Sequence, residues 1–249
     1  MFLAAPASGP DGGLPPYFAG MTGPARSALY EALGEAGGLI VVAGHRGSGR
    51  AATLEGLTSR RPDSLVVGDL EGPGGGGAAL RAARGRLVRA TIDCGDSITA
   101  PRRIAALGSE PFSIACVLRL VLAQRQVRRL CPSCRTPVQP PGSITAPLGL
   151  EPGAVVYRSP GCAACGRLGF AGAVGVFEAL PVDPSVGRLI VCGADEAAIA
   201  NHVFRTWPNL AAAARAVVIQ GLATAEDAIQ VLRSPRVVSS CRLRLERRG

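Results

Sequence analysis

Lysine is missing from this sequence, and all 27 basic side chains among its 249 residues are arginines. Aromatic residues make up only 4% of the chain, so we expect a core of Ala, Val, Leu and Ile. No apolar run approaches the roughly 18–20 residues of a membrane-spanning helix. The first residues, MFLAAPASGP, have no basic segment ahead of a short apolar stretch, which predicts no signal peptide. We therefore expect a cytoplasmic protein, in which cysteines bind metal or stay reduced.

Hydrophobic residues at 47% and charged residues at 18% indicate a globular protein and exclude a disordered one. A chain of this length buries roughly 70–75% of its unfolded surface, so it can form a sizeable core. The net charge of +9 is compatible with nucleotides, anionic lipids, acidic proteins or nucleic acid, and it selects none of them.

A glycine-rich loop, GHRGSGR, follows an apolar run at residues 38–44 and precedes a segment that can start a helix. A strand, such a loop and a helix form the context of a phosphate-binding loop, whose pattern is Gly, four residues, Gly, Lys and then Ser or Thr. Arg50 stands in the lysine position and Ala51 in the hydroxyl position. The candidate nucleotide-binding residues are Gly44, Gly47, Ser48, Gly49, Arg50 and Ala51.

These two exchanges affect phosphate binding and ATP hydrolysis differently. Backbone N–H groups of the loop and the helix N-terminus attract phosphate whatever the side chains are, and Arg50 keeps a positive charge. Ala51 has no oxygen, so Mg²⁺ loses its protein ligand there and ATP binding is expected to be weak. The alternative is that residues 44–49 form only a tight turn, with Arg50 paired to Asp69 or Glu71.

Four cysteines form two CxxC pairs, Cys131 with Cys134 and Cys162 with Cys165. Two thiolates in one tight turn can reach a single ion, and two such turns complete a tetrahedral zinc site. The alternatives are chance clustering or a redox dithiol. A site with four protein ligands is closed, so the zinc is expected to be structural. Cys94, Cys116, Cys192 and Cys241 lack this spacing, and we expect them to be small buried apolar residues.

The rest of the chain predicts an α/β protein: a P-loop sheet with a tetracysteine zinc subdomain and a small helical C-terminal region. We expect a buried strand at 63–70, which ends in an acid near Asp69, and a further strand at 86–93. We also expect a glycine loop at 72–77 and a helix at 113–130. The expected divisions are a flexible lead-in (1–16), a truncated P-loop core (17–130), the zinc subdomain (131–182), the helical region (183–234) and a basic tail (235–249).

Five stretches resemble the assembly ATPases of type II secretion and type IV pilus systems. The segments 108–134 and 161–183 are similar to the region around that family's tetracysteine motif. PDSLVVGDL is similar to its Walker B strand, RLVRATIDCGD to the strand ending in its histidine box, and ATAEDAIQVLR to its final helix. The resemblance, which covers residues 17 to 234, implies a shortened, RecA-like P-loop NTPase sheet. It also implies an ATP-binding, oligomeric protein that works with secretion or pilus proteins.

The departures from that family fall at its catalytic positions. Beside Arg50 and Ala51, Asp69 stands where the family has its catalytic glutamate, Glu71 where it has an arginine, and Asp93 where it has the box histidine. Phosphoryl transfer depends on positioning and charge neutralisation. We therefore expect a truncated, motif-degenerate member that does not hydrolyse ATP, or an adaptor that assembles with itself or with an intact paralogue, peripheral at the inner membrane through partners.

Two other functions remain open at this stage. An active motor subunit would need Arg50 and Asp69 to suffice, with Asp69 the doubtful catalytic residue. A zinc-bearing nucleic-acid module would use arginines beside the cysteines, namely Arg119, Arg125, Arg128, Arg129 and Arg135. Aromatic platforms for bases are scarce, which disfavours nucleic acid. His45, inside the glycine loop, is expected to be a solvated loop residue.

Overall fold

The computed structural model describes residues 16–58, 60–151 and 153–233. Its central sheet has five strands in the order β2-β3-β1-β4-β7. The first four run parallel, and β7 runs antiparallel to β4. Their bounds are β1 Gly38–Ala43, β2 Leu65–Asp69, β3 Leu87–Ile92, β4 Leu118–Leu130 and β7 Phe170–Pro181. The α/β class with a central parallel sheet is therefore confirmed.

Ten α-helices lie in the described part of the chain. They are α1 Gly23–Gly34, α2 Arg50–Thr58, α3 Gly75–Ala82, α4 Ala100–Ala106, α5 Pro111–Val117, α6 Gly142–Thr145, α7 Pro184–Val191, α8 Glu196–Val203, α9 Leu210–Ile219 and α10 Ala225–Arg233. Three short 3-10 turns are η1 Pro16–Gly20, η2 Ala146–Leu148 and η3 Ala163–Cys165, and a second, two-stranded sheet pairs β5 Thr136–Val138 with β6 Val156–Arg158.

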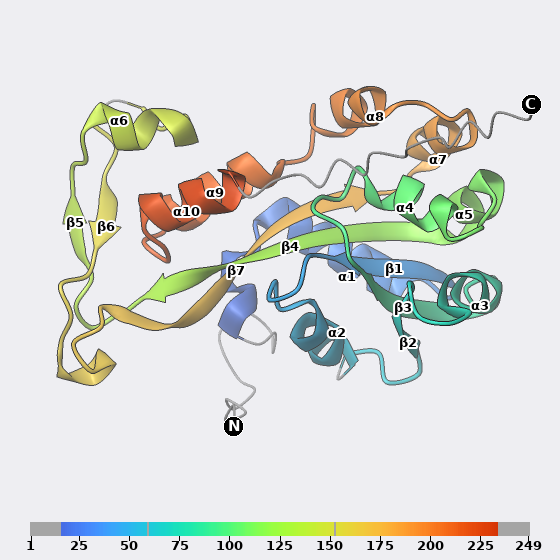
Figure 1. Cartoon of the computed structure of the whole chain (residues 1–249), viewed down its shortest axis with the longest axis horizontal. Coiled ribbons are helices and arrows are strands. Elements are labelled where there is room, and N and C mark those ends of the chain that lie inside the picture. Colours follow the sequence, from blue (N-terminus) through green and yellow to red (C-terminus); the bar gives the residue numbers. More distant parts are fainter. Residues whose placement is uncertain (1–15, 59, 152, 234–249) are drawn as a thin grey trace, which may run out of the picture.

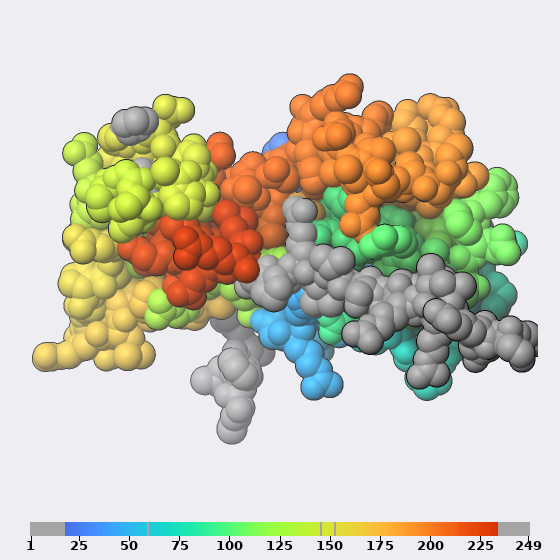
Figure 2. All heavy atoms as spheres, turned by 45° about the horizontal axis from the view of Figure 1, so that its top comes forward, coloured from blue at the N-terminus to red at the C-terminus, as the bar shows by residue number. Residues whose placement is uncertain are grey.

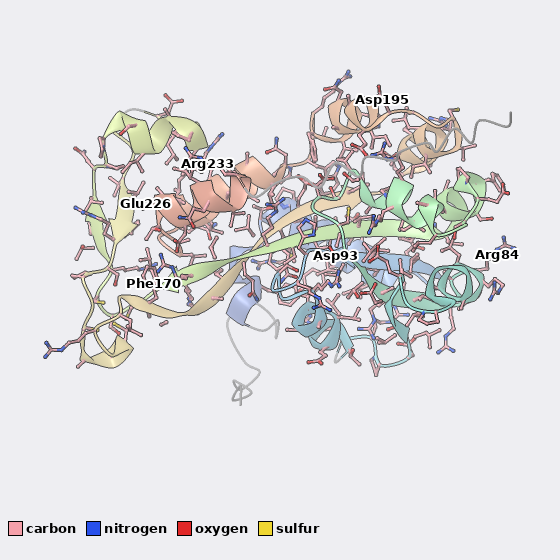
Figure 3. The ribbon with its side chains drawn as sticks, viewed as in Figure 1. Arg84, Asp93, Phe170, Asp195, Glu226 and Arg233 are labelled. Carbon is pink, nitrogen blue, oxygen red and sulfur yellow. The ribbon has the colours of Figure 1, made fainter. Side chains whose placement is uncertain are left out.

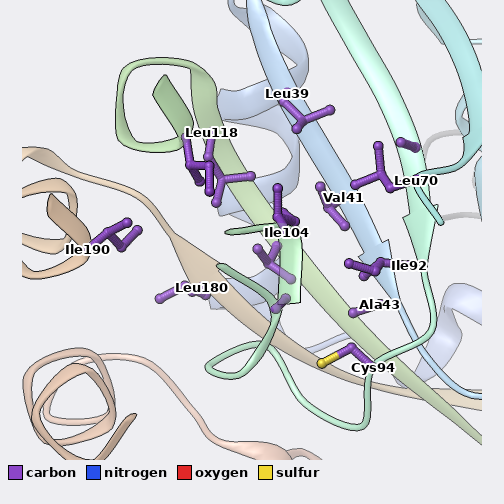
Figure 4. Packing of buried hydrophobic residues seen from close by; sticks show 14 of the residues in the cluster. Leu39, Val41, Ala43, Leu70, Ile92, Cys94, Ile104, Leu118, Leu180 and Ile190 are labelled. Carbon is purple, nitrogen blue, oxygen red and sulfur yellow. The ribbon is translucent and has the colours of Figure 1, made fainter. Parts of the chain in front are cut away.

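Both faces of the central sheet are covered. Every residue of β1 is buried, as expected of a strand inside a parallel sheet. Leu39 and Val41 pack toward α3, α4, α5 and α7 (Figure 4), whereas Ile40 and Val42 pack toward η1, α1 and α2. The strand therefore places the residues that follow Ala43 at a fixed point on the carboxyl edge of the sheet.

The expected helix at 113–130 is wrong beyond Val117, because the chain continues as strand β4. Leu118, Val121 and Ala123 face one core cluster, while Leu120 and Leu122 face the other. A strand that is buried on both faces does not alternate between apolar and polar residues. Its continuous apolar run therefore fits the 3.6-residue period of a helix as well as the two-residue period of a strand.

Two smaller expectations also need correction. Strand β2 was expected to be buried, but it is the edge strand next to β3, and Val66 is 42% exposed. The glycine loop at 72–77 is shorter than expected because α3 begins at Gly75. The lead-in 1–16, apart from Pro16, and the basic tail 235–249 lie outside the described residues.

Strands β4 and β7 extend beyond the sheet as a long antiparallel pair that carries the cysteine-bearing segment, and we call residues 125–175 the arm (Figure 1). Helices α9 and α10 pack against the arm. Arg128 on β4 binds Asp227 on α10 through two hydrogen bonds of 3.0 and 2.7 Å and lies over the ring of Phe170. Arg135 donates to the carbonyl oxygens of Gln220 and Gly221. These contacts tie the arm to the C-terminal helices.

No described helix has both the length and the apolar character needed to cross a membrane. The division into domains stays a prediction. Strand β7, within the expected zinc subdomain, is hydrogen-bonded to β4 in the central sheet.

Candidate functional site

The glycine loop lies between β1 and α2, at the carboxyl edge of the parallel strands. Gly47 and Gly49 have φ angles of 84° and 82°, in the left-handed region that glycine adopts without strain. A Cβ at Gly49 would collide with the side-chain amide of Gln126. The loop therefore favours glycine at this position for its backbone conformation, and a side chain there would also displace the amide of Gln126.

The loop presents free hydrogen-bond donors. Within the described part of the chain, the backbone N–H groups of Gly47, Gly49 and Ala51 have no acceptor. Ser48 is only 7% exposed, and its Oγ atom lacks a hydrogen-bond partner among the described residues. Unpaired N–H groups at the start of a nine-residue helix form an anion-binding arrangement.

Arg50 is held by the protein itself. Its Nη1 donates to the carbonyl oxygen of Gly44 at 2.8 Å, and its Nη2 lies 3.0 Å from Asp69 Oδ2. A second carboxylate oxygen, Asp93 Oδ2, lies 3.9 Å from Nη1. The side chain is 17% exposed. The predicted pairing of Arg50 with Asp69 is thus present, whereas Glu71 binds Arg103 instead, at 2.7 and 2.8 Å.

His45 is not the solvated residue that the sequence indicated. Its Nδ1 lies 2.7 Å from Asp93 Oδ1, and its side chain is 36% exposed. His45 is on the loop and Asp93 follows β3, so the bond joins two segments that are distant in sequence. Figure 3 shows Asp93 at the centre of the molecule, beside the sheet. Arg50, Asp69, Asp93 and His45 therefore form one polar cluster, which we call the loop cluster.

The hydroxyl of Thr53, two residues after Ala51, does not replace the missing ligand. Thr53 is fully buried, and its hydroxyl donates to Gln124 Oε1. Gln124 Nε2 in turn donates to the carbonyl oxygen of Ser48 at 2.8 Å. The Thr53 hydroxyl is therefore engaged with β4 and does not supply the oxygen that Ala51 lacks.

A small cavity of about 170 Å³ adjoins the loop. Helix α10 closes one side of it with Val231, whose carbonyl oxygen accepts a 2.6 Å hydrogen bond from Arg125. Arg125 also donates to the carbonyl oxygen of Gly95, which lines the same cavity. Sites for drug-sized ligands typically measure about 300–1,000 Å³, so this cavity holds a phosphate-sized group more readily than a whole nucleotide.

The four predicted zinc ligands come together on the arm. Their sulfur atoms all lie within 4.8 Å of one another. The separations are 4.0 Å between Cys131 and Cys162, 3.9 Å between Cys134 and Cys165, and 3.9 Å between Cys162 and Cys165. Four sulfurs about 2.3 Å from a tetrahedral zinc ion lie about 3.8 Å apart. The thiol positions therefore fit a zinc ion.

Hydrogen bonds from the backbone favour the thiolate form of one of these cysteines, which is the form that binds metal. The N–H groups of Cys162 and Gly169 donate to Cys165 Sγ at 3.2 and 3.3 Å and lower the pKa of that thiol to about 6. Desolvation, together with the hydrogen bond from Cys134, raises the pKa of Cys162 to about 11. A bound cation favours the thiolate form of all its sulfur ligands.

The remaining cysteines differ from expectation. Cys94 is buried, as predicted, and desolvation raises its pKa to about 11. Cys116 and Cys192 are exposed, so their assignment to the core was wrong. Cys241 lies outside the described residues.

Comparison with known proteins gives consistent matches. A family model described as type II/IV secretion system protein matches residues 57–230. The type II secretion system protein E of Pseudomonas aeruginosa is 31% identical over 186 residues, which cover 74% of this chain and 37% of that protein. The type IV pilus assembly ATPase PilB of Thermus thermophilus is 36% identical over 148 residues, covering 57% of this chain and 17% of that protein. The chain thus spans well under half of these relatives.

Solved structures share the fold at low sequence identity. The pilus retraction motor PilT with bound ADP superposes with a TM-score of 0.61 at 17% identity, covering 88% of this chain and 68% of that chain. The ATPase DotB of Legionella pneumophila gives a TM-score of 0.57 at 15% identity, with 88% of this chain and 65% of that chain covered.

Proposed function

Because the chain belongs to the type II/IV secretion system protein family, we propose that it is a motif-degenerate subunit or adaptor of a secretion or pilus machine. In this proposal it binds nucleotide weakly or not at all and does not hydrolyse ATP. It works at the cytoplasmic side of the inner membrane through its partners, as a homo-oligomer or together with an intact paralogue.

The loop cluster carries this proposal. Hydrolysis of ATP needs a metal ion beside the phosphates and an acid positioned toward the nucleophile. In this chain the carboxylate of Asp69 is paired with Arg50, and a guanidinium stands close to both Asp69 and Asp93. Ala51 supplies no metal ligand. Because Arg50 already neutralises the carboxylates of Asp69 and Asp93, a divalent cation would gain little binding free energy from them.

Residual anion binding rests on the backbone. The N–H groups of Gly47, Gly49 and Ala51 and the hydroxyl of Ser48 would hold a phosphate group without any metal. Binding of this kind responds to phosphate charge and is indifferent to Mg²⁺. Arg50 would contribute only by loosening its bonds to Gly44 and Asp69.

The zinc ion in this proposal is structural, with Cys131, Cys134, Cys162 and Cys165 as its four ligands. With no open coordination position, it would supply no chemistry beyond holding the two cysteine turns together. Those turns already meet through the backbone, since Cys131 N–H donates to the carbonyl oxygen of Gly169 at 3.0 Å.

The nucleic-acid alternative loses support from the arginine contacts. Four of the five arginines on which it depended donate to carbonyl or carboxylate groups of the protein, namely Arg119, Arg125, Arg128 and Arg135. Arginines engaged in this way are less available to phosphates.

Restoring the loop tests the proposal. The double variant Arg50→Lys with Ala51→Thr is expected to gain Mg²⁺-dependent ATP binding, with at least a roughly tenfold tightening on adding Mg²⁺, because lysine and a hydroxyl are the groups the loop pattern requires. Calorimetric titration with and without Mg²⁺ measures this effect. Ala52→Thr is the matched control, since it places the same hydroxyl one residue along α2, on another face. Mg²⁺-dependent ATP turnover by the unaltered protein would contradict the proposal.

A further inference from the structure

The tip of the second cysteine turn projects from the arm with an unusual backbone. Arg167 has a φ of 65°, and it is the one non-glycine residue with a positive φ in the described part of the chain. Leu168, beside it, is 75% exposed. A left-handed conformation disfavours every residue with a side chain except Asn and Asp, so glycine would be the easier choice at 167. We call residues 167 and 168 the knuckle tip.

The knuckle tip offers an apolar group beside a charged one. The Leu168 side chain has little contact with the protein, and the Arg167 side chain makes no ion pair with any other described residue. Residues in sparsely populated backbone conformations cluster at ligand clamps, active sites and switch regions. The tip is therefore suited to insertion into an apolar pocket with a negative rim.

Such a pocket lies at the opposite end of the molecule, and we call it the α4–α8 groove. It has a volume of about 310 Å³ and lies between α4 and the segment joining α7 to α8. Its apolar walls are formed by Ile98, Pro101, Ala105, Ile190 and Ile199. An apolar cavity of roughly 150 Å³ is enough to bind benzene, so a leucine side chain fits easily.

The rim of the α4–α8 groove is acidic. Asp195 is exposed, and its Oδ1 accepts a 2.7 Å hydrogen bond from the N–H of Ala198, whereas its second carboxylate oxygen takes part in no ion pair with a described residue. Glu196 is paired with Arg102 at 2.5 Å. Asp195 is therefore the carboxylate most available to an incoming arginine. The chain has a net charge of +9, so most of its surface repels an arginine. An apolar groove beside the exposed carboxylate of Asp195 attracts the arginine of the knuckle tip instead.

The two features cannot meet within one molecule. Figure 1 shows the arm and its cysteine turns at one end of the long axis and α7 and α8 at the other, and Figure 2 shows the same separation from a second direction. In Figure 3, Phe170, two residues after the tip, and Asp195 stand at opposite sides of the molecule.

We propose that the knuckle tip of one copy of this chain docks into the α4–α8 groove of a second copy, with Leu168 in the apolar pocket and Arg167 against Asp195. A contact between two different surfaces of the same chain is heterologous, so it builds a ring when the rotation closes and an open filament when it does not. The proposal is independent of nucleotide binding at the glycine loop.

Sedimentation velocity over a concentration series of the zinc-loaded full chain tests this contact. Arg167→Gly removes the charge and relieves the backbone, so we expect at least tenfold weaker association with an unchanged or higher unfolding midpoint. A residue with only a structural role would leave association intact. Leu168→Ser is expected to weaken association to a similar degree while retaining zinc. Val155→Ser, which alters another exposed apolar residue of the arm, is the control and should associate normally.

The groove side has its own variant. Asp195→Asn removes the charge but keeps a side-chain oxygen for the cap of α8, and it should weaken association as Arg167→Gly does. In a mixture, Arg167→Gly chains keep a functional groove and Asp195→Asn chains keep a functional tip, so the mixture should associate more than either alone. A protein that is monomeric at every concentration, or tip variants that associate like the unaltered chain, would overturn the proposal.

Discussion

Cys165→Ser is expected to abolish tight zinc binding and to loosen the arm. The four thiols are the cluster in the described residues with spacing for a metal ion, and Cys165 is the one that two backbone N–H groups hold toward the thiolate form. Structural zinc contributes about 10–16 kcal/mol of apparent binding free energy in zinc-finger peptides. Loss of one ligand in four removes a large part of that free energy.

Metal content after dialysis against a competing chelator measures the first effect, and limited proteolysis measures the second. The unaltered chain should keep one zinc ion, and Cys165→Ser should keep almost none and become cleavable within residues 131–169. Cys192→Ser changes an exposed cysteine outside the arm and serves as the control. Equal zinc content in both variants would show that the four thiols do not form the metal site.

Glu178→Ala is expected to lower the free energy of unfolding by about 3 kcal/mol, because three donors lose their acceptor in the protein interior. Glu178 lies on β7 and is 4% exposed. Its Oε1 accepts hydrogen bonds from the N–H and hydroxyl of Ser97, at 3.0 and 2.6 Å, and its Oε2 accepts one from Leu210 N–H at 2.8 Å. The carboxylate thus joins the segment after β3 to the start of α9.

Denaturant titration monitored by circular dichroism measures this change. Glu151→Ala, at an exposed position on the arm, should change the free energy of unfolding by less than about 0.5 kcal/mol. The segment that Glu178 holds begins near Asp93 and Gly95, so Glu178→Ala should also disturb the loop cluster. A loss below about 1 kcal/mol would mean that water satisfies the freed donors.

Local sequence patterns predicted the parts of the fold that depend on neighbouring residues. The strand at 38–44, the glycine loop and the following helix are all present. A strand that is buried on both faces is a continuous apolar run in the sequence, and the positive φ angles of the loop favour glycine at 47 and 49. The cysteine spacing predicted the cluster on the arm for a similar reason, since each pair needs only one tight turn.

Features set by distant contacts were missed. Strand β4 pairs with β7, about fifty residues later in the chain, and its arginines at 125, 128 and 129 recur at a helical spacing. The bond between His45 and Asp93 joins residues 48 apart, and no local pattern indicates it. The sequence did show that Asp93 stands where the resembling family has a histidine. An aspartate at this position could have prompted a search for a basic side chain to pair with it, and His45 is that side chain.

The loop cluster is the basis of our proposal that phosphate binding and ATP turnover separate in this chain. Its backbone donors do not depend on side chains, so they survive the exchanges at 50 and 51. Its acids Asp69 and Asp93, however, lie close to the guanidinium of Arg50. About 1 Å of displacement of a catalytic group can cost on the order of 100-fold in rate, and the shorter side chain of Asp69 adds such a displacement.

Calorimetric titration of the zinc-loaded, unaltered protein with ATP, in the presence and absence of Mg²⁺, tests the central claim most directly. The account predicts weak binding or none, with the same affinity in both conditions, because the loop offers backbone donors and no metal ligand. ATP binding that tightens with Mg²⁺, accompanied by release of ADP, would contradict it and identify the chain as an active motor subunit.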